Sequence, residues 1–402
     1  MPPPAARRWD VVVWGATGYT GRLVAEALVA GAPPGLRWAL GGRDAARLER
    51  LRRDLGADAG IAVADAHDPA SLSVLARGTR VVASTVGPYA SHGTPLVAAC
   101  VEAGTHYADL TGEVTWMRAT VDAFHEAARA RGARIVHACG FDSVPSDLGL
   151  WWLQHQAVAR HGRPCHRVVH GFGPMVGGFS GGTVASALAL LEAAVADPAT
   201  RRALADPDVL APGAAPSPPA RPPWWPHYDD DLGAWTAPFF MAGVNRRVAR
   251  RTRALLGEPW GARFRYRECW RARGWVDAAA MALAHGAAPA LLAVGPLRRW
   301  AQRRLLPRPG EGPSAAARAR GFFRTRLVGR VEGVDAPLVL RLACDLDPGY
   351  GATALMLREA ALSLALDDLD ADGGVLTPAV AFGERLVTRL RRAGMRIDLD
   401  DG

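Results

Sequence analysis

Short apolar runs alternate with amphipathic stretches over residues 1–147, and this pattern predicts a parallel sheet covered by helices. The runs expected as strands are residues 11–14, 36–40, 61–64, 80–85, 106–110 and 134–139. Between them, apolar residues recur at the spacing of one helix face. Strands and helices that alternate in this way are typical of a doubly wound α/β fold. We therefore expect residues 1–147 to form one domain.

Residues 148–402 lack this regular alternation and predict a second, α+β domain that covers a substrate or forms a homodimer. Its β-rich segments are 263–270, 322–331 and 338–344, and in two of them arginine alternates with apolar or aromatic residues. Such alternation predicts a sheet with one solvated and one packed face. Residues 354–366 and 379–392 predict helices that pack the C-terminal part back onto the first domain.

A proline-rich stretch interrupts the second domain. Residues 206–226 contain eight prolines, which exclude a regular helix or a central strand, so a loop is expected. Trp224 and Trp225 at its end, and Trp235 beyond it, have two interpretations. They cover the core of the second domain, or they line an acyl channel or touch a bilayer.

The segment after residue 277 combines apolar and basic stretches. Residues 278–297 are rich in alanine and leucine, but glycines and prolines break them, so no membrane-spanning helix is expected. The basic and apolar residues that follow are Arg298, Arg299, Trp300, Arg303, Arg304, Leu305 and Leu306. They suit peripheral contact with anionic lipid at the inner face of the plasma membrane, or they form an ordinary solvated helix.

A glycine-rich turn follows the first expected strand. Its spacing is G-x-x-G-x-x-G, with Thr17 where the commoner dinucleotide pattern has its middle glycine. Glycines here allow a tight turn, close approach of a pyrophosphate and close packing of the next helix. The expected contacts to the dinucleotide are Gly15, Thr17, Gly18, Tyr19, Thr20 and Gly21. The first domain is therefore expected to be an NAD(P)-binding Rossmann domain.

The end of the second strand indicates which dinucleotide binds. Gly42 leaves room for a 2′-phosphate, and Arg43 supplies a guanidinium to hold it, so NADP(H) is the expected cofactor. Asp44 is the competing residue, since it has the chemistry to bind a ribose hydroxyl, but its place before a helix favours an N-cap. The remaining expected cofactor contacts, after the third and fourth strands, are Asp65, Gly87 and Pro88.

Polar side chains after the fourth to sixth strands are candidates for the chemical step. Ligands of such sheets bind outside the carboxyl ends of the strands, so these side chains should converge near a nicotinamide. The candidates for proton donor or oxyanion stabilisation are Tyr89, His92, Tyr107, Asp142 and Ser143. The alternative interpretation is that Tyr107 belongs to the core and that Asp142 and Asp147 hold turns or caps around Pro145.

The composition narrows the chemistry further. All 48 basic residues are arginine, and the net charge is +9. The absence of lysine excludes a lysine Schiff base and the tyrosine-lysine pair of short-chain reductases. No nucleic-acid motif accompanies the charge, so no nucleic-acid partner is expected. Five scattered cysteines without a C-x-x-C pair, and no apolar leader, predict a cytoplasmic protein without a metal site.

Several motifs along the chain together resemble one enzyme family. They are residues 87–89 (GPY), 92–93 (HG), 107–113 (YADLTGE), 140–147 (GFDSVPSD), 180–183 (SGGT), 309–313 (PGEGP), 349–354 (GYGATA) and 373–378 (GGVLTP). In this combination the sequence is similar to the saccharopine dehydrogenase-like oxidoreductases, and within them to the trans-acting enoyl reductases. The resemblance covers nearly the whole chain.

The resemblance implies an NADP(H)-dependent reductase that acts in trans on an unsaturated polyketide or fatty-acyl thioester, presented on a carrier, during complex lipid synthesis. Saccharopine-cleaving members rely on charged substrate-binding residues, for which no matching lysine is present here. Two other hypotheses remain open. One is a dehydrogenase of a small amino or keto acid, and the other is a non-catalytic NADP-binding protein at a membrane.

Overall fold

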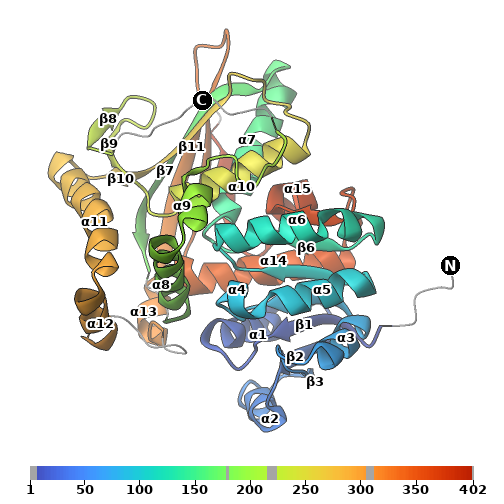
Figure 1. The fold of residues 1–402 in the computed structure, drawn as a ribbon. Helices are drawn as coiled ribbons and strands as arrows, with labels where there is room; N and C mark the ends of the chain where they lie inside the picture. The colour runs from blue at the N-terminus through green and yellow to red at the C-terminus, as the bar shows by residue number, and fades with distance from the viewer. Residues whose placement is uncertain (1–6, 178–180, 215–223, 305–311, 401–402) are drawn as a thin grey trace.

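Two sheets organise the protein. The computed structural model describes residues 7–177, 181–214, 224–304 and 312–400. Their strands form two seven-stranded sheets, ordered β13-β6-β5-β4-β1-β2-β3 and β14-β12-β11-β7-β10-β9-β8. In Figure 1 the first sheet and its helices lie at the lower right, and β7, β10 and β11 of the second sheet rise through the upper left.

The first sheet is parallel throughout and confirms the predicted doubly wound α/β fold. Its strands are β1 (Trp9–Trp14), β2 (Trp38–Gly42), β3 (Gly60–Val63), β4 (Thr79–Ser84), β5 (His106–Asp109), β6 (Arg134–Val136) and β13 (Gly374–Leu376). The helices of this part are α1 (Tyr19–Gly31), α2 (Ala45–Asp54), α3 (Pro69–Arg77), α4 (Tyr89–His92), α5 (Thr94–Ala103), α6 (Val114–Ala130) and α7 (Val144–His161).

Different helices cover the two faces of the first sheet. Val11 and Val13 of β1 belong to a core that includes α1 and α14 (Thr353–Leu366), whereas Val12 and Trp14 pack with α3 and α5. This division follows from the two-residue period of a strand. Every residue of α14 from Thr353 to Ala365 is buried, as expected of a helix that is apolar on most sides.

The strand β13 comes from near the end of the chain. It pairs in parallel with β6, with Val375 opposite Ile135. This strand was not predicted from the sequence, because three residues are too few to show an alternation. The helix that follows, α15 (Pro378–Arg392), packs against α7 and α14. Asp147 of α7 accepts a hydrogen bond from the Ala379 amide at 2.8 Å, so the end of the chain is tied to the first sheet.

The second sheet is mixed. Its strands are β7 (Cys165–Val176), β8 (His227–Asp229), β9 (Ala234–Ala237), β10 (Arg265–Ala272), β11 (Phe322–Val331), β12 (Leu338–Cys344) and β14 (Arg396–Leu399). Only β7 and β10 run parallel among its neighbouring pairs of described strands. Phe323 and Leu327 of β11 face the main core, and Arg324 and Arg326 lie on the other face, as the sequence alternation predicts.

The remaining helices lie around the second sheet. They are α8 (Gly181–Ala196), α9 (Pro198–Ala205), α10 (Ala242–Leu255), α11 (Trp275–Ala293), α12 (Gly295–Arg304), α13 (Ala315–Ala319) and the π-helix η1 (Pro348–Ala352). Parts of the expected loop and motifs lie outside the described residues, namely 215–223, Ser180, Leu305, Leu306 and residues 309–311. Within the described ranges, no helix is long and apolar enough to cross a membrane.

Candidate active site

The glycine-rich turn after β1 has the backbone geometry that a close-lying pyrophosphate requires. Gly15 has a φ of 83°, where an L side chain would be strained. A Cβ on Gly21 would lie 2.1 Å from the Gly15 carbonyl oxygen, so α1 approaches the turn more closely than a side chain permits. Thr17 and Gly18 are exposed, and Gly18 caps α1 without a side chain. The first-turn amides of α1, such as that of Thr20, are thus open to an anion.

Tyr19 differs from the other turn residues because its side chain contacts the second half of the chain. Its hydroxyl donates to the Pro313 carbonyl at 2.6 Å and accepts a hydrogen bond from Arg318 at 2.9 Å. Its ring meets the ring of Tyr350 edge-on, with 5.0 Å between centroids. The side chain of Tyr19 therefore fastens these segments to the turn. If Tyr19 contacts the cofactor as predicted, it does so through its backbone amide, because its side chain is already engaged.

The end of β2 is suited to a 2′-phosphate. Gly42 is the last residue of β2, and Arg43 after it is exposed and makes no hydrogen bond or ion pair with the described residues. Asp44 accepts a hydrogen bond from the Arg47 amide at 3.0 Å and caps α2. The capping interpretation of Asp44 is therefore confirmed. The guanidinium of Arg43 remains available to an anion.

The structure brings Gly87 and Pro88 beside the glycine-rich turn but places Asp65 farther away. These two residues follow β4, which pairs directly with β1. A Cβ on Gly15 would lie 2.6 Å from the side chain of neighbouring Val86. Asp65 follows β3, the edge strand, and its Oδ1 accepts a hydrogen bond from the His67 amide at 2.9 Å. One oxygen of the Asp65 carboxylate is thus used to hold a turn.

Tyr89 is held inside the protein rather than at an open edge. Its hydroxyl donates to the Ser84 carbonyl at 3.2 Å and accepts a hydrogen bond from the Leu110 amide at 3.3 Å. Burial, and then the nearby Asp109, raise the pKa of Tyr89 well above its usual range. The Glu113 carboxylate accepts from the Tyr89 amide at 2.9 Å, which fixes the segment after β4. The contacts of Tyr89 therefore favour a structural role.

His92 and Tyr107 lie in different surroundings. The Nδ1 atom of His92 is buried and has no hydrogen-bond partner among the described residues, and its ring packs edge-on against His67 at 5.3 Å. Tyr107 is fully buried in β5, and burial, then Asp109, raise its pKa well above the usual range. The structure thus places Tyr107 in the core, the alternative that the sequence left open. His92 retains a nitrogen that is free to meet a ligand.

Asp142 and Ser143 follow β6 and begin the last helix of the first part. Burial raises the pKa of the Asp142 carboxyl to about 6, although part of the residue is exposed. Asp142 makes no hydrogen bond or ion pair within the described chain. Ser143 is buried and donates its hydroxyl hydrogen to Oδ1 of Asn245 at 3.1 Å. Of these two residues, Asp142 has the free group and the pKa that suit proton transfer near neutral pH.

Comparison with known proteins identifies the family of this chain. Residues 11–136 match the saccharopine dehydrogenase NADP binding domain. A protein of Mycobacterium tuberculosis assigned as a trans-acting enoyl reductase is 44% identical over 97% of both chains. The trans-acting enoyl reductase of Mycobacterium bovis is 39% identical over 98% of both chains. The chain belongs to the saccharopine dehydrogenase-like oxidoreductases. It is an NAD(P)-dependent reductase of this family.

The fold of this saccharopine dehydrogenase-like reductase agrees with the assignment. The apo saccharopine dehydrogenase of Saccharomyces cerevisiae superposes with a TM-score of 0.54, covering 97% of this chain and 99% of that chain at 13% identity. At this identity the likeness concerns the fold alone. The glycine-rich turn, Arg43 and the end of β6 therefore lie in an architecture that the yeast enzyme shares.

A buried polar network in the reductase was not predicted from the sequence. Asn245 of α10 donates to Oε2 of Glu268 at 2.9 Å, and Tyr266 donates to Oε1 of Glu268 at 2.6 Å. His170 lies 3.2 Å from the Tyr266 hydroxyl. Burial raises the pKa of Glu268 to about 7 and lowers that of His170 to about 3. Through Ser143, the network connects the end of β6 to the second sheet.

One signal in the sequence pointed to this network. In β10, alternate residues face the core, and Glu268 stands on that face between Tyr266 and Trp270. A carboxylate on the packed face of a strand requires hydrogen-bonding partners. The partners themselves come from distant parts of the chain, so the sequence alone does not name them.

Proposed function

We propose that this protein reduces the carbon-carbon double bond of an unsaturated polyketide or fatty-acyl thioester, in trans, with NADPH as the reductant. The observation that carries the proposal is the full-length similarity to trans-acting enoyl reductases, at 44% and 39% identity. A carrier-bound substrate in complex lipid synthesis is the context that this class of relative supports.

The preference for NADPH rests on the end of β2. The residue after Gly42 is an exposed arginine with no partner among the described residues, and the nearby acid, Asp44, is occupied as a helix cap. A guanidinium forms paired, charge-assisted hydrogen bonds with a phosphate. Arg43 would hold the 2′-phosphate, and the glycine-rich turn would hold the pyrophosphate.

The chemistry then requires one proton donor from the protein. When bound, NADPH would supply the hydride for the β-carbon of the substrate, and the resulting enolate would need a proton at its α-carbon. Asp142 is the proposed donor, because its carboxyl has a pKa of about 6 and no partner among the described residues. His92, with its unpartnered Nδ1, is the second candidate.

Titration with NADPH and NADH tests the cofactor assignment. Arg43→Ala should weaken NADPH binding about 10- to 100-fold and leave NADH binding unchanged, because a hydrogen bond to a charged group contributes about 1.5–3 kcal/mol. Arg53→Ala, in the last turn of α2, removes the same charge and serves as the control. Equal affinity of wild type and Arg43→Ala for NADPH would contradict the assignment.

NADPH oxidation with different substrates tests the reaction. Enoyl thioesters on coenzyme A or on a carrier should support oxidation, and the saturated thioester should accumulate. Small amino or keto acids tested with NADP⁺ or NADPH identify the alternative dehydrogenase. NADPH binding without turnover of any of these substrates would favour the non-catalytic hypothesis.

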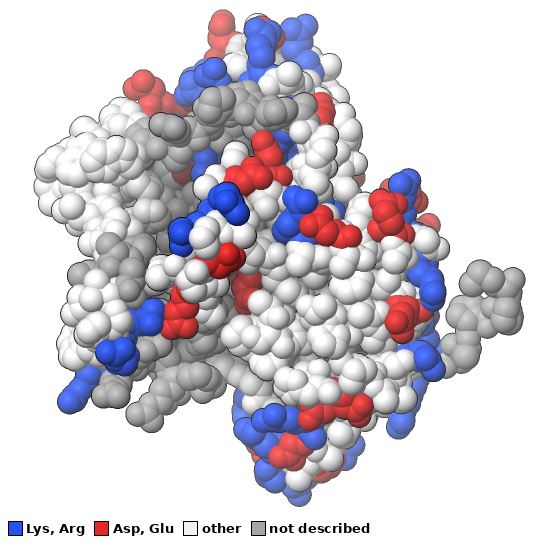
Figure 2. Space-filling view, viewed as in Figure 1, with Lys and Arg blue, Asp and Glu red and all other residues white. Residues whose placement is uncertain are grey.

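We also propose peripheral membrane contact through a lobe made of α11 and α12. Trp275, Leu283 and Trp300 are exposed there by 48%, 60% and 57%. Figure 2 shows few charged side chains on this left-hand lobe, and basic side chains gather at its lower end, where α12 lies in Figure 1. Exposed tryptophans beside arginines suit the headgroup region of an anionic bilayer.

Co-sedimentation with vesicles tests this contact. The protein should bind vesicles that contain phosphatidylglycerol more tightly than pure phosphatidylcholine, and Trp275→Ser with Trp300→Ser should weaken that binding. Val74→Ser, on α3 and 73% exposed, removes apolar surface elsewhere and is the control. Equal sedimentation of the tryptophan and control variants would contradict the proposal.

A further inference from the structure

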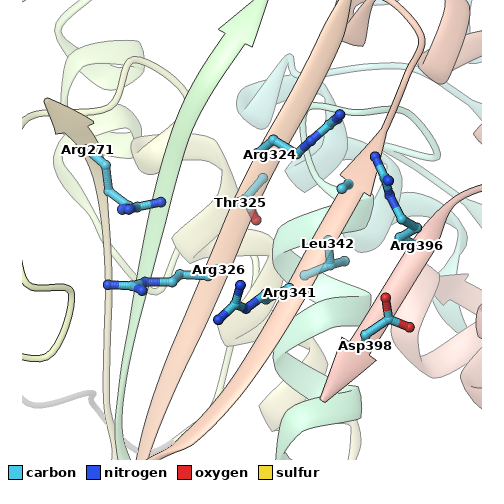
Figure 3. Close-up of a pocket in the computed structure, with 9 residues that line it drawn as sticks. Arg271, Arg324, Thr325, Arg326, Arg341, Leu342, Arg396 and Asp398 are labelled. Carbon is cyan, nitrogen blue, oxygen red and sulfur yellow. The ribbon is translucent and has the colours of Figure 1, made fainter. Parts of the chain in front are cut away.

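Arginines from four strands gather on the outer face of the second sheet. They are Arg271 of β10, Arg324 and Arg326 of β11, Arg341 of β12 and Arg396 of β14. Figure 3 shows their guanidinium groups around one hollow of about 360 Å³, in a row that crosses the sheet. The β-sheet register explains the row, because Arg326 lies opposite Arg341 and both Arg324 and Arg396 pair with Ala343.

This arginine hollow lies on the opposite side of the sheet from the candidate active site. Along β11, Phe323 and Thr325 face the core, and Arg324 and Arg326 face outward. The Phe323 ring lies 4.8 Å from the ring of Phe141, the residue before Asp142. The sheet itself therefore separates the hollow from the end of β6.

Some arginines of the hollow form ion pairs with carboxylates and others do not. Arg324 and Arg396 form ion pairs with Asp345, and Arg341 forms one with Asp400. Each of these arginines thus has a carboxylate partner. The same is not true of the two arginines nearest the centre of the sheet.

Among the described residues, Arg271 and Arg326 bind backbone carbonyls and no carboxylate. Arg271 donates to the Gly173 carbonyl at 3.2 Å, and Arg326 donates to the Leu232 carbonyl. The Nε atom of each is buried and has no hydrogen-bond partner among the described residues. Burial lowers the pKa of both guanidinium groups, and neighbouring arginines lower it further, while Asp400 partly offsets this for Arg326. Two half-buried cations therefore lie close together, and neither forms an ion pair with a carboxylate of the described residues.

A glycine makes room for the side chain of Arg271. Gly171 of β7 lies opposite Arg326, and a Cβ there would lie 2.5 Å from Cδ of Arg271. The aliphatic part of the Arg271 side chain thus passes over β7 at Gly171, where the lack of a side chain leaves room for it. Asp398 is the acidic residue that lines the hollow, and it is exposed.

We propose that this hollow binds the phosphate group of a phosphate monoester, with Arg271 and Arg326 as the direct contacts and Arg324, Arg341 and Arg396 around them. The planar fork of arginine matches the oxygens of a phosphate, and a dianion supplies the ion-pair partner that Arg271 and Arg326 do not have among the described residues. The hollow is large enough for a small phosphorylated molecule or a phosphorylated headgroup. This site goes beyond the proposed reductase function.

Calorimetric titration of the full chain with inorganic phosphate and glycerol 3-phosphate tests the proposal. Saturating NADP⁺ is present throughout, so that the glycine-rich turn does not bind the probe. The double variant Arg271→Gln/Arg326→Gln should bind both probes at least about tenfold more weakly, since each lost guanidinium removes charged hydrogen bonds.

The matched control is Arg263→Gln/Arg265→Gln. Arg265 lies on the same strand as Arg271, is exposed and has no described partner, while Arg263 is 91% exposed on its side chain. The control removes the same charge and should keep wild-type affinity. NADPH affinity and the circular dichroism spectrum of both variants verify that they fold.

A second experiment, with vesicles, distinguishes a phosphate on a lipid from a phosphate on a free small molecule. Loss of binding to phosphatidic acid vesicles in the double variant, but not in the control, identifies a lipid-borne phosphate. Loss of glycerol 3-phosphate binding alone identifies a free ligand. Equal weakening in both variants would overturn the proposal, because only the overall charge would then matter. The absence of phosphate binding to the wild-type protein would also overturn the proposal. So would a double variant that binds phosphate like wild type and differs only in that a homodimer dissociates.

Discussion

Tyr19 donates its hydroxyl hydrogen to the backbone carbonyl of Pro313, with 2.6 Å between the oxygens. The bond joins the dinucleotide turn to a segment 294 residues later in the chain. A Cβ on Gly312 would lie 2.4 Å from the Tyr19 ring, so the segment before α13 packs directly on that ring. The turn is therefore supported by the second half of the protein as well as by its own sheet.

Tyr19→Phe should loosen the segment that this hydroxyl holds. The variant loses hydrogen bonds worth about 0.5–1.5 kcal/mol each, so backbone amides of α13 should exchange hydrogen several-fold faster. Hydrogen exchange read by mass spectrometry measures the effect. Tyr228→Phe, on exposed β8, should leave the exchange of α13 unchanged. Identical hydrogen exchange of the α13 amides in wild type and Tyr19→Phe would show that the hydroxyl does not stabilise this segment.

Gly21→Ala should disrupt the dinucleotide site. The new methyl group would meet the Gly15 carbonyl oxygen at 2.1 Å, and a backbone atom cannot move aside as a side chain does. We expect a loss of about 1–3 kcal/mol in unfolding free energy and a loss of NADPH affinity. Gly274→Ala, where no heavy atom lies within 4 Å of the added Cβ, should change neither. Thermal unfolding and cofactor titration measure both quantities.

Glu113→Ala should release the segment that follows β4. The carboxylate accepts hydrogen bonds from the amides of Tyr89 at 2.9 Å and Ala90 at 2.8 Å. Loss of this buried acceptor should cost about 1–3 kcal/mol of stability and lower kcat. Glu113→Gln retains one acceptor oxygen and should show a smaller loss. If Glu113→Ala unfolds at the wild-type temperature, the carboxylate does not hold this segment.

Glu268 should make stability depend on pH. Its folded pKa of about 7 lies above its usual 4.5, so the folded state keeps a proton that the unfolded chain has released. The contribution is complete below pH 4.5 and is lost as pH rises through 7, at most about 3 kcal/mol in all. Denaturant unfolding from pH 4 to 8 should show a flatter profile for Glu268→Gln than for wild type.

The matched control for this titration is Glu384→Gln. Glu384 is exposed on α15, so its replacement should leave the slope of stability against pH unchanged. Asp142 and Asp147, whose pKa values burial raises to about 6, should keep part of the slope in both variants. A wild-type slope in Glu268→Gln would mean that the pKa of Glu268 is the same in the folded and unfolded states.

Asp142 should determine how kcat falls at the alkaline end, or limb, of its pH profile. A proton donor works only while protonated, so kcat should fall as pH rises above about 6. Asp142→Asn should lower kcat about 10²- to 10⁴-fold, flatten this limb and leave NADPH affinity near that of wild type. His92→Ala is measured alongside. If His92→Ala abolishes the limb and Asp142→Asn retains it, the donor is His92.

The sequence was sufficient for the features that depend on local pattern. Apolar period and glycine spacing predicted the parallel sheet and the turn at Gly15 to Gly21, and the position of Asp44 before a helix predicted its cap. Each of these is determined within one strand, one turn or one helix start. Local sequence contains all the physical information they need.

Features that depend on distant contacts could not be read in this way. Glu268 is held by Asn245 and by Tyr266, and Asn245 in turn binds Ser143, which lies in another part of the chain. The hydroxyl of Tyr89 is satisfied by backbone groups of two different strand ends, which the pattern around Tyr89 does not show. The partners of a buried polar group are chosen by tertiary packing, and a single sequence does not list them.

The pairing of β13 with β6 determines when the nucleotide-binding half is completed during synthesis. Until Leu376 has left the ribosome, β6 keeps an open edge, because the strand that covers it comes from near the end of the chain. An unpaired edge is a template for pairing with another chain. A transcript cut short before Gly374 would therefore yield a chain whose nucleotide-binding sheet keeps that edge exposed.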